Sequence, residues 1–267
     1  MTQMKAEDVR TVVREHYGSV ARAGAATACA PGCCAAGSGL LGYTPDQTTA
    51  VPEGADLGLG CGNPTAIAAL RPGQTVLDLG AGGGFDCFIA AHQVGATGRV
   101  IGVDMTADMV TLARANARKV EATNVEFRLG EIEHLPVADA SVDVILSNCV
   151  INLSPDKPAV FAEAFRVLAP DGRLAISDVV ATGPIPRELQ HEVAALAGCV
   201  AGAAPIDELR AMLAAAGFVD VRVELAPRSA EIVGSWQLGI ERFVAAATIE
   251  ARKPRAGEAC CPPGCCA

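Results

Sequence analysis

The sequence predicts an α/β fold, with a mostly parallel sheet and a small α+β part near the C-terminal end. Between positions 75 and 180, short apolar runs alternate with helical stretches of ten or more residues, a pattern typical of βαβ units. A glycine-rich turn at residues 80–84 separates the first apolar run from the first helical stretch. With 267 residues, 51% hydrophobic and 19% charged, the chain can bury a substantial core.

The N-terminal part is predicted to be one helix and a long loop. Residues 5–20 carry a helical periodicity with charges on one face. Gly, Ala, Cys and Pro then dominate residues 21–64, a composition typical of loops.

The central elements follow in chain order from residue 75. Apolar or alternating runs predict strands at 76–80, 99–104, 124–129, 142–148 and 173–180. Helical periodicity predicts helices at 85–94, 107–121 and 157–168. Together these elements predict alternating strands and helices, with the strands forming one sheet.

The pattern changes beyond residue 180. Two prolines open an Ala-rich stretch that is predicted to be helical to residue 202, and a further helix is expected at 207–216. Strands are expected at 218–225 and 243–251. The tail from Lys253 has three prolines and no periodicity, so no regular structure is expected there.

The charge pattern argues against nucleic acid and membrane partners. Thirty acidic residues outnumber 21 basic ones, and no Lys/Arg-rich run offers a footprint for a phosphate backbone. No stretch of about 20 strongly apolar residues is present. Acidic residues stand where a secretory signal would begin its apolar core, so a cytoplasmic location is expected.

The glycine-rich turn predicts a nucleotide-type site. Glycines between a strand and a helix let the backbone approach a ligand closely. A dinucleotide-binding loop would need a third glycine or alanine where Phe85 or Cys87 stands, and no Lys-Ser/Thr pair follows for a phosphate-binding loop. The remaining pattern, an acid followed by alternating glycines, is that of S-adenosylmethionine (SAM) methyltransferases.

A sulfonium ligand also explains the acids around the turn, because a carboxylate attracts a sulfonium and repels a phosphate. Asp104, 26 residues after Asp78, is placed to accept hydrogen bonds from both ribose hydroxyls, with Met105 beside the adenine. The residues predicted to bind this cofactor are Asp78, Gly80, Gly82, Gly84, Asp104, Met105, Glu131, Ile132 and Asn148.

Eleven cysteines are unusual in a chain expected in a reducing compartment, where structural disulfides are rare. Seven lie in two clusters near the ends, and four are single. The clusters are Cys29, Cys33 and Cys34, and Cys260, Cys261, Cys265 and Cys266; the single ones are Cys61, Cys87, Cys149 and Cys199. Chemistry with a metal, a metalloid or a redox partner is the natural interpretation.

Three of the single cysteines could converge over the cofactor's methyl group. Cys149 follows the end of a predicted strand, Cys199 lies among small residues, and Cys61 lies in a Gly-Cys-Gly turn. Each alone could instead be a small buried apolar residue. Zinc usually takes closely paired cysteines, which only the terminal clusters offer, so thiolates binding a soft trivalent centre fit better.

Four motifs carry a resemblance to a known family, over about residues 10 to 253. They are Gly-Cys-Gly-Asn-Pro (60–64), Asp-Leu-Gly-Ala-Gly-Gly-Gly-Phe-Asp-Cys (78–87), Ser-Asn-Cys-Val-Ile-Asn-Leu (147–153) and Gly-Cys-Val-Ala-Gly-Ala (198–203). The chain resembles arsenite methyltransferases. The resemblance implies a Rossmann-like SAM-dependent methyltransferase fold and methyl transfer to thiolate-bound trivalent arsenic, from arsenite to methylated arsenicals.

The resemblance also implies roles for the cysteines. Cys149 and Cys199 would hold arsenic throughout, and Cys61 would be the third ligand. An N-terminal cysteine, Cys33 or Cys34 in preference to Cys29, would complete the redox set, while Cys87 is expected to be structural. Thioredoxin, glutathione or another thiol would reduce the enzyme between turnovers.

The resulting domain interpretation has four parts. They are an N-terminal helix and Cys-rich loop (1–64), a SAM-binding Rossmann-like domain (65–182), a C-terminal part that completes the arsenic site (183–253) and a Cys-rich tail (254–267), which could capture arsenite. A monomer is expected. Two other functions remain open: a quinone- or sterol-type C-methyltransferase, and a non-enzymatic thiol-rich protein that sequesters metalloids.

Overall fold

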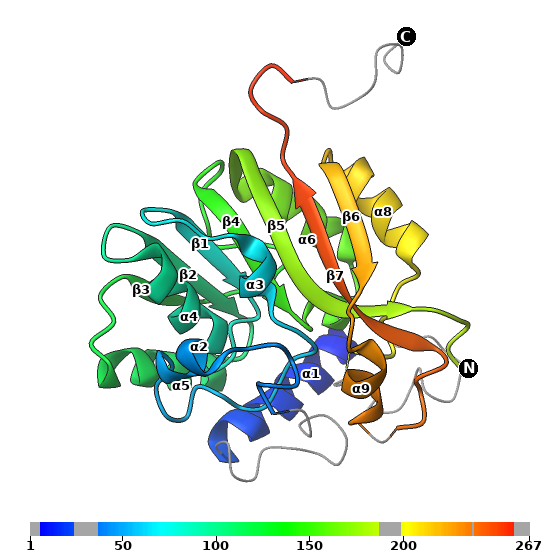
Figure 1. Cartoon of the computed structure of the whole chain (residues 1–267), viewed down its shortest axis with the longest axis horizontal. Coiled ribbons are helices and arrows are strands. Elements are labelled where there is room, and N and C mark those ends of the chain that lie inside the picture. The colour runs from blue at the N-terminus through cyan, green and yellow to red at the C-terminus, as the bar shows by residue number, and fades with distance from the viewer. Residues whose placement is uncertain (1–5, 24–36, 187–198, 237, 259–267) are drawn as a thin grey trace.

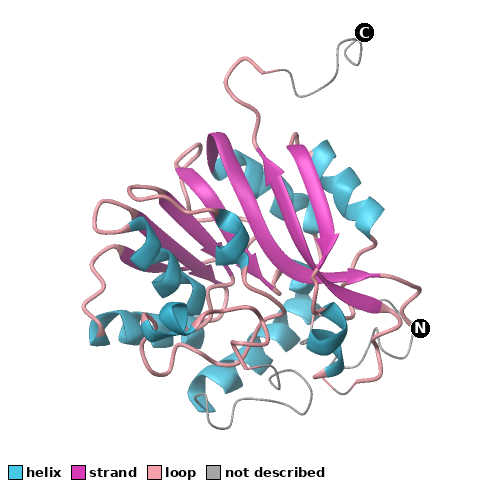
Figure 2. Cartoon of the chain, viewed as in Figure 1, coloured by secondary structure: helices cyan, strands magenta, loops and turns pink. Residues whose placement is uncertain are grey.

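One seven-stranded sheet organises the chain. The structure, a computed structural model, describes residues 6–23, 37–186, 199–236 and 238–258. The strand order is β3-β2-β1-β4-β5-β7-β6, and neighbouring strands are parallel except in the two pairs that include β7. Helices cover both faces of the sheet (Figures 1 and 2). The predicted α/β fold with a mostly parallel sheet is confirmed.

The described elements follow the predicted order. The strands are β1 (Thr75–Leu79), β2 (Arg99–Asp104), β3 (Val125–Leu129), β4 (Val142–Asn148), β5 (Leu168–Ala181), β6 (Val219–Leu225) and β7 (Val244–Arg252). The helices are α1 (Ala6–Ala23), α2 (Pro45–Thr49), α3 (Pro64–Ala68), α4 (Phe85–Val94), α5 (Ala107–Lys119), α6 (Lys157–Val167), α8 (Ile206–Ala215) and α9 (Ser229–Gly234). A single 3-10 turn, η1 (Ile151–Leu153), follows β4.

Alternate residues of the central strands pack on opposite faces of the sheet. Leu77 and Leu79 of β1 share a core with Phe161 of α6. Val76 lies on the opposite face of the strand and packs instead with Phe88 of α4. Strands that are buried on both faces have nearly continuous apolar sequences. For this reason the positions of the central strands could be predicted closely from the sequence.

The junction of α6 and β5 differs from the prediction. The helix ends at Val167, and the strand begins at Leu168 rather than at residue 173. Leu168 already pairs with Val142, and the register shifts before Arg173. The Pro-Asp-Gly segment between them, which reads as a turn, is therefore an irregularity within the strand.

Short helices also differ from the prediction. The segment 21–64 was expected to be loop, but α2 lies within it, with a capping box between Thr44 and Gln47. Such a box satisfies backbone N–H groups that have no helical partner. The helix α9 was not expected either, because six residues carry too little periodicity to reveal it.

Several predictions fall outside the described residues. The Ala-rich stretch is described only at its ends, where residues 199–202 form a turn rather than a helix. The cysteines at positions 29, 33 and 34, and the four of the tail, lie outside the described part. The four-part domain division stays a prediction, although β6 and β7 belong to the same sheet as β1 to β5.

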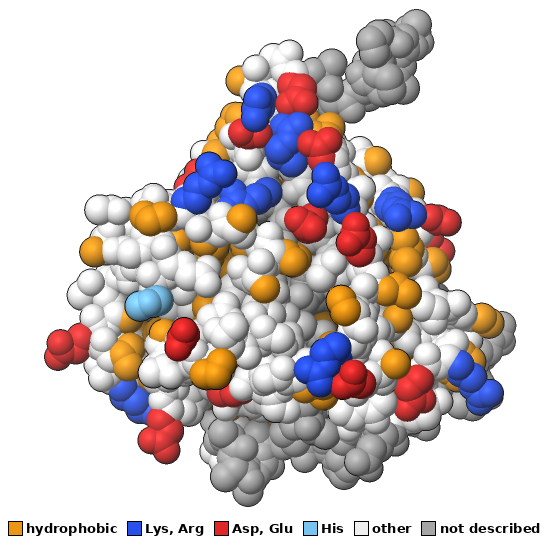
Figure 3. All heavy atoms as spheres, viewed as in Figure 1, with side chains coloured by type: hydrophobic (Ala, Val, Ile, Leu, Met, Phe, Trp, Pro, Cys, Tyr) orange, Lys and Arg blue, Asp and Glu red, His pale blue; other side chains and the backbone are white. Residues whose placement is uncertain are grey.

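The surface carries mixed charge on the face drawn in Figure 3, where Lys and Arg side chains lie among Asp and Glu side chains. Arg252, for example, pairs with both Asp220 and Glu258. In the described part of the chain, no helix has the length and apolar character needed to cross a membrane.

Candidate functional site

A cavity of about 1030 Å³, counted with its open mouth, lies at the carboxyl ends of β1, β2 and β4. The strand order reverses between β1 and β4, which is where open α/β sheets bind ligands. Gly82 and Asp104 line one part of the cavity, and Cys149 and Cys199 line another. Trp236, which follows α9, completes its apolar wall.

The three glycines predicted to bind cofactor have different surroundings. All have positive φ, from 52° to 95°. A side chain at Gly82 would enter open space, whereas a Cβ atom at Gly84 would lie 2.7 Å from Phe88 and 2.8 Å from Phe127. Gly80 and Gly82 line the cavity and Gly84 does not. Gly82 thus permits close approach of a ligand, while Gly84 permits close packing of α4.

Asp104 ends β2 and turns its carboxylate into the cavity. The Gly82 backbone N–H donates to it over 3.0 Å, and the Thr106 N–H donates over 2.8 Å. Burial raises the pKa of Asp104, and the two backbone hydrogen bonds oppose that rise. This carboxylate both braces the glycine turn and faces the ligand space, beside Met105 and Ile132.

Asp78 and Glu131 do not line the cavity, contrary to the expectation that they face the cofactor. Asp78 shares the sheet face of Val76, so it points toward α4, where the Cys87 thiol donates to it over 3.2 Å. Burial raises the pKa of Asp78 well above its usual range, and the Asp86 charge adds to the rise. Glu131 instead accepts a hydrogen bond from Arg14, 2.6 Å away, and so ties α1 to the fold.

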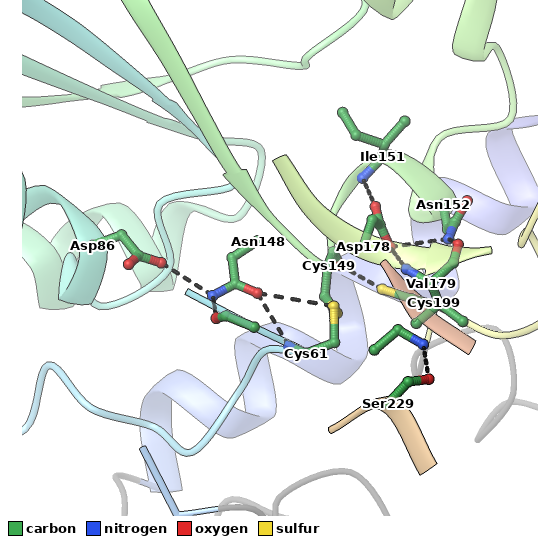
Figure 4. Close-up of a disulfide and its surroundings, with 12 residues drawn as sticks. Cys61, Asp86, Asn148, Cys149, Ile151, Asn152, Asp178, Val179, Cys199 and Ser229 are labelled. Atoms are coloured by element: carbon green, nitrogen blue, oxygen red, sulfur yellow. Dashed lines mark hydrogen bonds between the residues drawn. A yellow bond between two sulfur atoms is a disulfide. The ribbon is translucent and has the colours of Figure 1, made fainter. Parts of the chain in front are cut away.

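The three sulfur-bearing residues predicted to act together do lie together. Cys61 and Cys149 form a disulfide across 88 residues of sequence (Figure 4). The Cys199 thiol donates a hydrogen bond to the backbone carbonyl of Cys149. Cys33 and Cys34 lie outside the described residues.

The backbone at this sulfur centre is held in a strained region. Cys149 has φ of 55° and Cys199 has φ of 63°, in the left-handed region that costs an L-residue roughly 1–2 kcal/mol. Such conformations persist where the surroundings impose them, and they cluster at functional sites.

Asn148 connects the sulfur centre to a buried acid. Its side-chain oxygen accepts from the Cys61 N–H over 3.1 Å, and its amide donates to Asp86 over 3.2 Å. Tyr43 donates to the other oxygen of Asp86 over 2.6 Å. Burial raises the pKa of Asp86 to about 6, against the two hydrogen bonds. Asn148 also lines the cavity.

Sequence reasoning missed several of these residues. Tyr43 lies in no motif, and Asp86 lies within the 78–87 motif but was given no role there. The two meet only because the segment before α2 folds against the start of α4. Tyr17 reaches the cavity from α1, and Trp236 reaches it from the segment after α9. An amphipathic helix was the only available signal for Tyr17, and nothing marked Trp236.

The arrangement joins a ligand-binding end to a sulfur end within one cavity. The open space over Gly82 and the Asp104 carboxylate fit a nucleoside that carries positive rather than negative charge. The sulfur end offers soft donors. None of the three described histidines, His16, His92 and His134, lines the cavity.

The family model described as "Methyltransferase domain" matches residues 70–217. An arsenite methyltransferase of Halobacterium salinarum is 52% identical over 264 residues, covering 93% of this chain and 67% of that protein. An arsenite methyltransferase of Aquipseudomonas alcaligenes is 42% identical over 198 residues, covering 72% of this chain and 57% of that protein. The chain thus spans between half and two thirds of these relatives.

The chain is also similar to solved structures of methyltransferases. An arsenic(III) S-adenosylmethionine methyltransferase from Chlamydomonas reinhardtii has a TM-score of 0.63 and 33% identity, covering 86% of this chain and 76% of that chain. A phosphoethanolamine N-methyltransferase of Haemonchus contortus, in complex with S-adenosyl-L-methionine, has a TM-score of 0.61 and 18% identity, covering 72% of this chain and 51% of that chain. The second likeness shows the fold alone.

Proposed function

The chain belongs to the arsenite methyltransferase family, and we propose that it moves the methyl group of SAM to trivalent arsenic bound by Cys61, Cys149 and Cys199. The observation that carries this proposal is the single cavity that Gly82, Asp104, Cys149 and Cys199 line together. SAM supplies an electrophilic methyl group on a sulfonium. Arsenite and methylated trivalent arsenicals are the substrates.

The chain's own residues hold and aim the reactants. Gly82 lets the cofactor approach the backbone, and Asp104 binds it by charge and hydrogen bonds. The thiolates hold arsenic so that its lone pair faces the methyl group, and no general base is required. Correct positioning of this kind is worth up to about 7–11 kcal/mol.

Arsenic binding requires the Cys61–Cys149 disulfide to be reduced, because a sulfur in a disulfide is not a thiolate. A dithiol reductant such as thioredoxin, or two molecules of glutathione, would give both cysteines as thiols and leave with its own sulfurs oxidised. Cys33 or Cys34 would take part in this redox set. A reducing compartment such as the cytoplasm suits this need, and a monomer suffices for it.

The test is an incubation of the full chain with SAM, a thiol and arsenite, with the arsenic species separated afterwards. Methylated arsenic that forms only when SAM is present supports the proposal. Stoichiometric arsenic binding without consumption of SAM would favour sequestration instead. A C-methyltransferase would leave arsenite unmethylated. That function also does not explain why three cysteines lie together.

A further inference from the structure

A buried carboxylate lies beside the sulfur centre and has no part in the roles described so far. Asp178 lies on β5 and is only 1% exposed. One of its carboxylate oxygens and the sulfurs of Cys61 and Cys149 all lie within 4.8 Å of one another. Figure 4 shows Asp178 next to the Cys149 side of the disulfide.

The hydrogen bonds of this carboxylate suit a charged group. The backbone N–H groups of Ile151 and Val179 donate to it over 3.0 and 2.7 Å, and the Asn152 side-chain amide donates over 2.9 Å. Lys157 favours its charged form. Within the described ranges, however, no cation forms an ion pair with Asp178. Its negative charge therefore remains available to the sulfur centre.

Methyl transfer moves positive charge toward this carboxylate. The arsenic lone pair forms the As–C bond, and the S–C bond breaks with its electron pair left on the cofactor sulfur. The sulfonium becomes a neutral thioether, and the thiolate-bound arsenic, neutral before the step, becomes positive. A fixed negative charge near the arsenic is thus more favourable in the transition state than before it.

We propose that Asp178 accelerates the reaction by stabilising the positive charge that develops on thiolate-bound arsenic. The inference rests on the proposed function, since it needs arsenic at the sulfurs of Cys61 and Cys149. A unit charge about 5 Å away in a partly screened interior changes a rate by about 10- to 100-fold when only part of the charge moves.

The same charge acts in the opposite direction on arsenic binding. A carboxylate near Cys61 and Cys149 disfavours their thiolate forms, which are the arsenic ligands. Removing the charge of Asp178 is therefore expected to leave arsenite affinity equal or greater. A purely structural role, holding the turn after Cys149, would weaken binding and catalysis together.

The experiment compares Asp178→Asn with wild type in the reduced full chain. Arsenite affinity is measured without SAM, and single-turnover methylation is measured from the preformed arsenite complex at saturating SAM. The expected result is a rate about 10- to 100-fold lower with arsenite affinity undiminished. Asp143→Asn is the matched control, because Asp143 is a half-buried carboxylate on β4 that accepts a backbone N–H, from Thr75. It is expected to keep the wild-type rate.

A second variant tests the role of Asp178 even if Asp178→Asn fails to fold. Lys157→Gln removes the cation that opposes the field of Asp178, so single-turnover methylation at pH 8 is expected to be faster. An unchanged rate in Asp178→Asn, parallel losses of rate and affinity, or a Lys157→Gln variant that is no faster than wild type would each overturn the role of Asp178. If wild type itself does not methylate arsenite, the proposed function fails instead.

Discussion

The side-chain oxygen of Asn148 accepts a hydrogen bond from the backbone N–H of Cys61, 3.1 Å away. The two residues are 87 positions apart in the sequence. Asn148 ends β4 immediately before Cys149, the disulfide partner of Cys61, so this contact helps to hold the Cys61 turn next to Cys149. The same amide donates to Gly62 and Asp86, which leaves it little freedom to rotate.

Asn148→Ala is expected to lower the free energy of unfolding by about 1–3 kcal/mol, because Asp86 and the Cys61 N–H lose a buried partner. It is also expected to slow the re-formation of the Cys61–Cys149 disulfide after reduction, since the Cys61 turn is no longer held in place. Urea unfolding and a time course of free thiols measure the two effects. Wild-type values in both measurements would contradict the role given to Asn148.

Alanine substitutions at Gly82 and Gly84 are expected to have different main effects, one on SAM binding and the other on stability. Gly82→Ala places a methyl group in the open cavity, so it weakens SAM binding with a stability cost of about 1–2 kcal/mol from its left-handed backbone. Gly84→Ala forces a contact with two phenylalanines and costs a further 1–3 kcal/mol, roughly, from overpacking. SAM titration and thermal unfolding of both variants check this. Equal effects of the two variants on SAM affinity would contradict the distinction.

Asp104→Ala is expected to weaken SAM binding by about 1.5–3 kcal/mol, the scale of a hydrogen bond to a charged group. Part of this loss comes from the glycine turn, because Gly82 donates to the same carboxylate. Asp104→Asn separates the two contributions, since the amide oxygen still accepts one hydrogen bond but carries no charge. A calorimetric titration with unchanged affinity in both variants would remove Asp104 from the binding site.

The sequence predicted the sheet far better than the site's interior. Strands such as β2 and β4 are marked by apolar runs, and their bounds match the prediction. Periodicity shows that Asp78 shares a face with Val76 but does not show that this face meets α4 rather than the ligand. The contact between Asn148 and Cys61 depends on the long-range fold, and no local pattern encodes it. Asp178 lies within an apolar strand and carried no signal.

Cys149→Ser and Cys199→Ser are each expected to abolish methylation of every trivalent arsenical while SAM affinity stays nearly unchanged. A hydroxyl is a hard, weakly coordinating replacement for a thiolate. Cys87→Ser is the matched control, because Cys87 is buried, lies outside the cavity and only donates to Asp78. Arsenic speciation after a fixed incubation measures the effect, and near-normal turnover in the Cys149 or Cys199 variant would refute the assignment.

The ionisation of Asp178 predicts how stability depends on pH. Burial raises its pKa to about 6 from an ordinary value of 3.8. The folded state therefore binds the proton more tightly than the unfolded state. The resulting stabilisation is complete well below the unfolded pKa of 3.8 and is lost as the pH rises through 6, a total change of about 3 kcal/mol at 1.36 kcal/mol per pKa unit.

Asp178→Asn cannot titrate, so its unfolding free energy is expected to lack this decline. The variant loses a hydrogen bond at every pH, because its NH2 group must face one of the donors to Asp178. That penalty shifts the curve without changing its slope. Urea unfolding from pH 4 to 8 is expected to show wild type losing about 2–2.5 kcal/mol more than the variant between pH 4 and 7. Parallel curves would mean that Asp178 keeps its ordinary pKa in the fold. The hydrogen bonds to the carboxylate would then fully offset the cost of burying its charge.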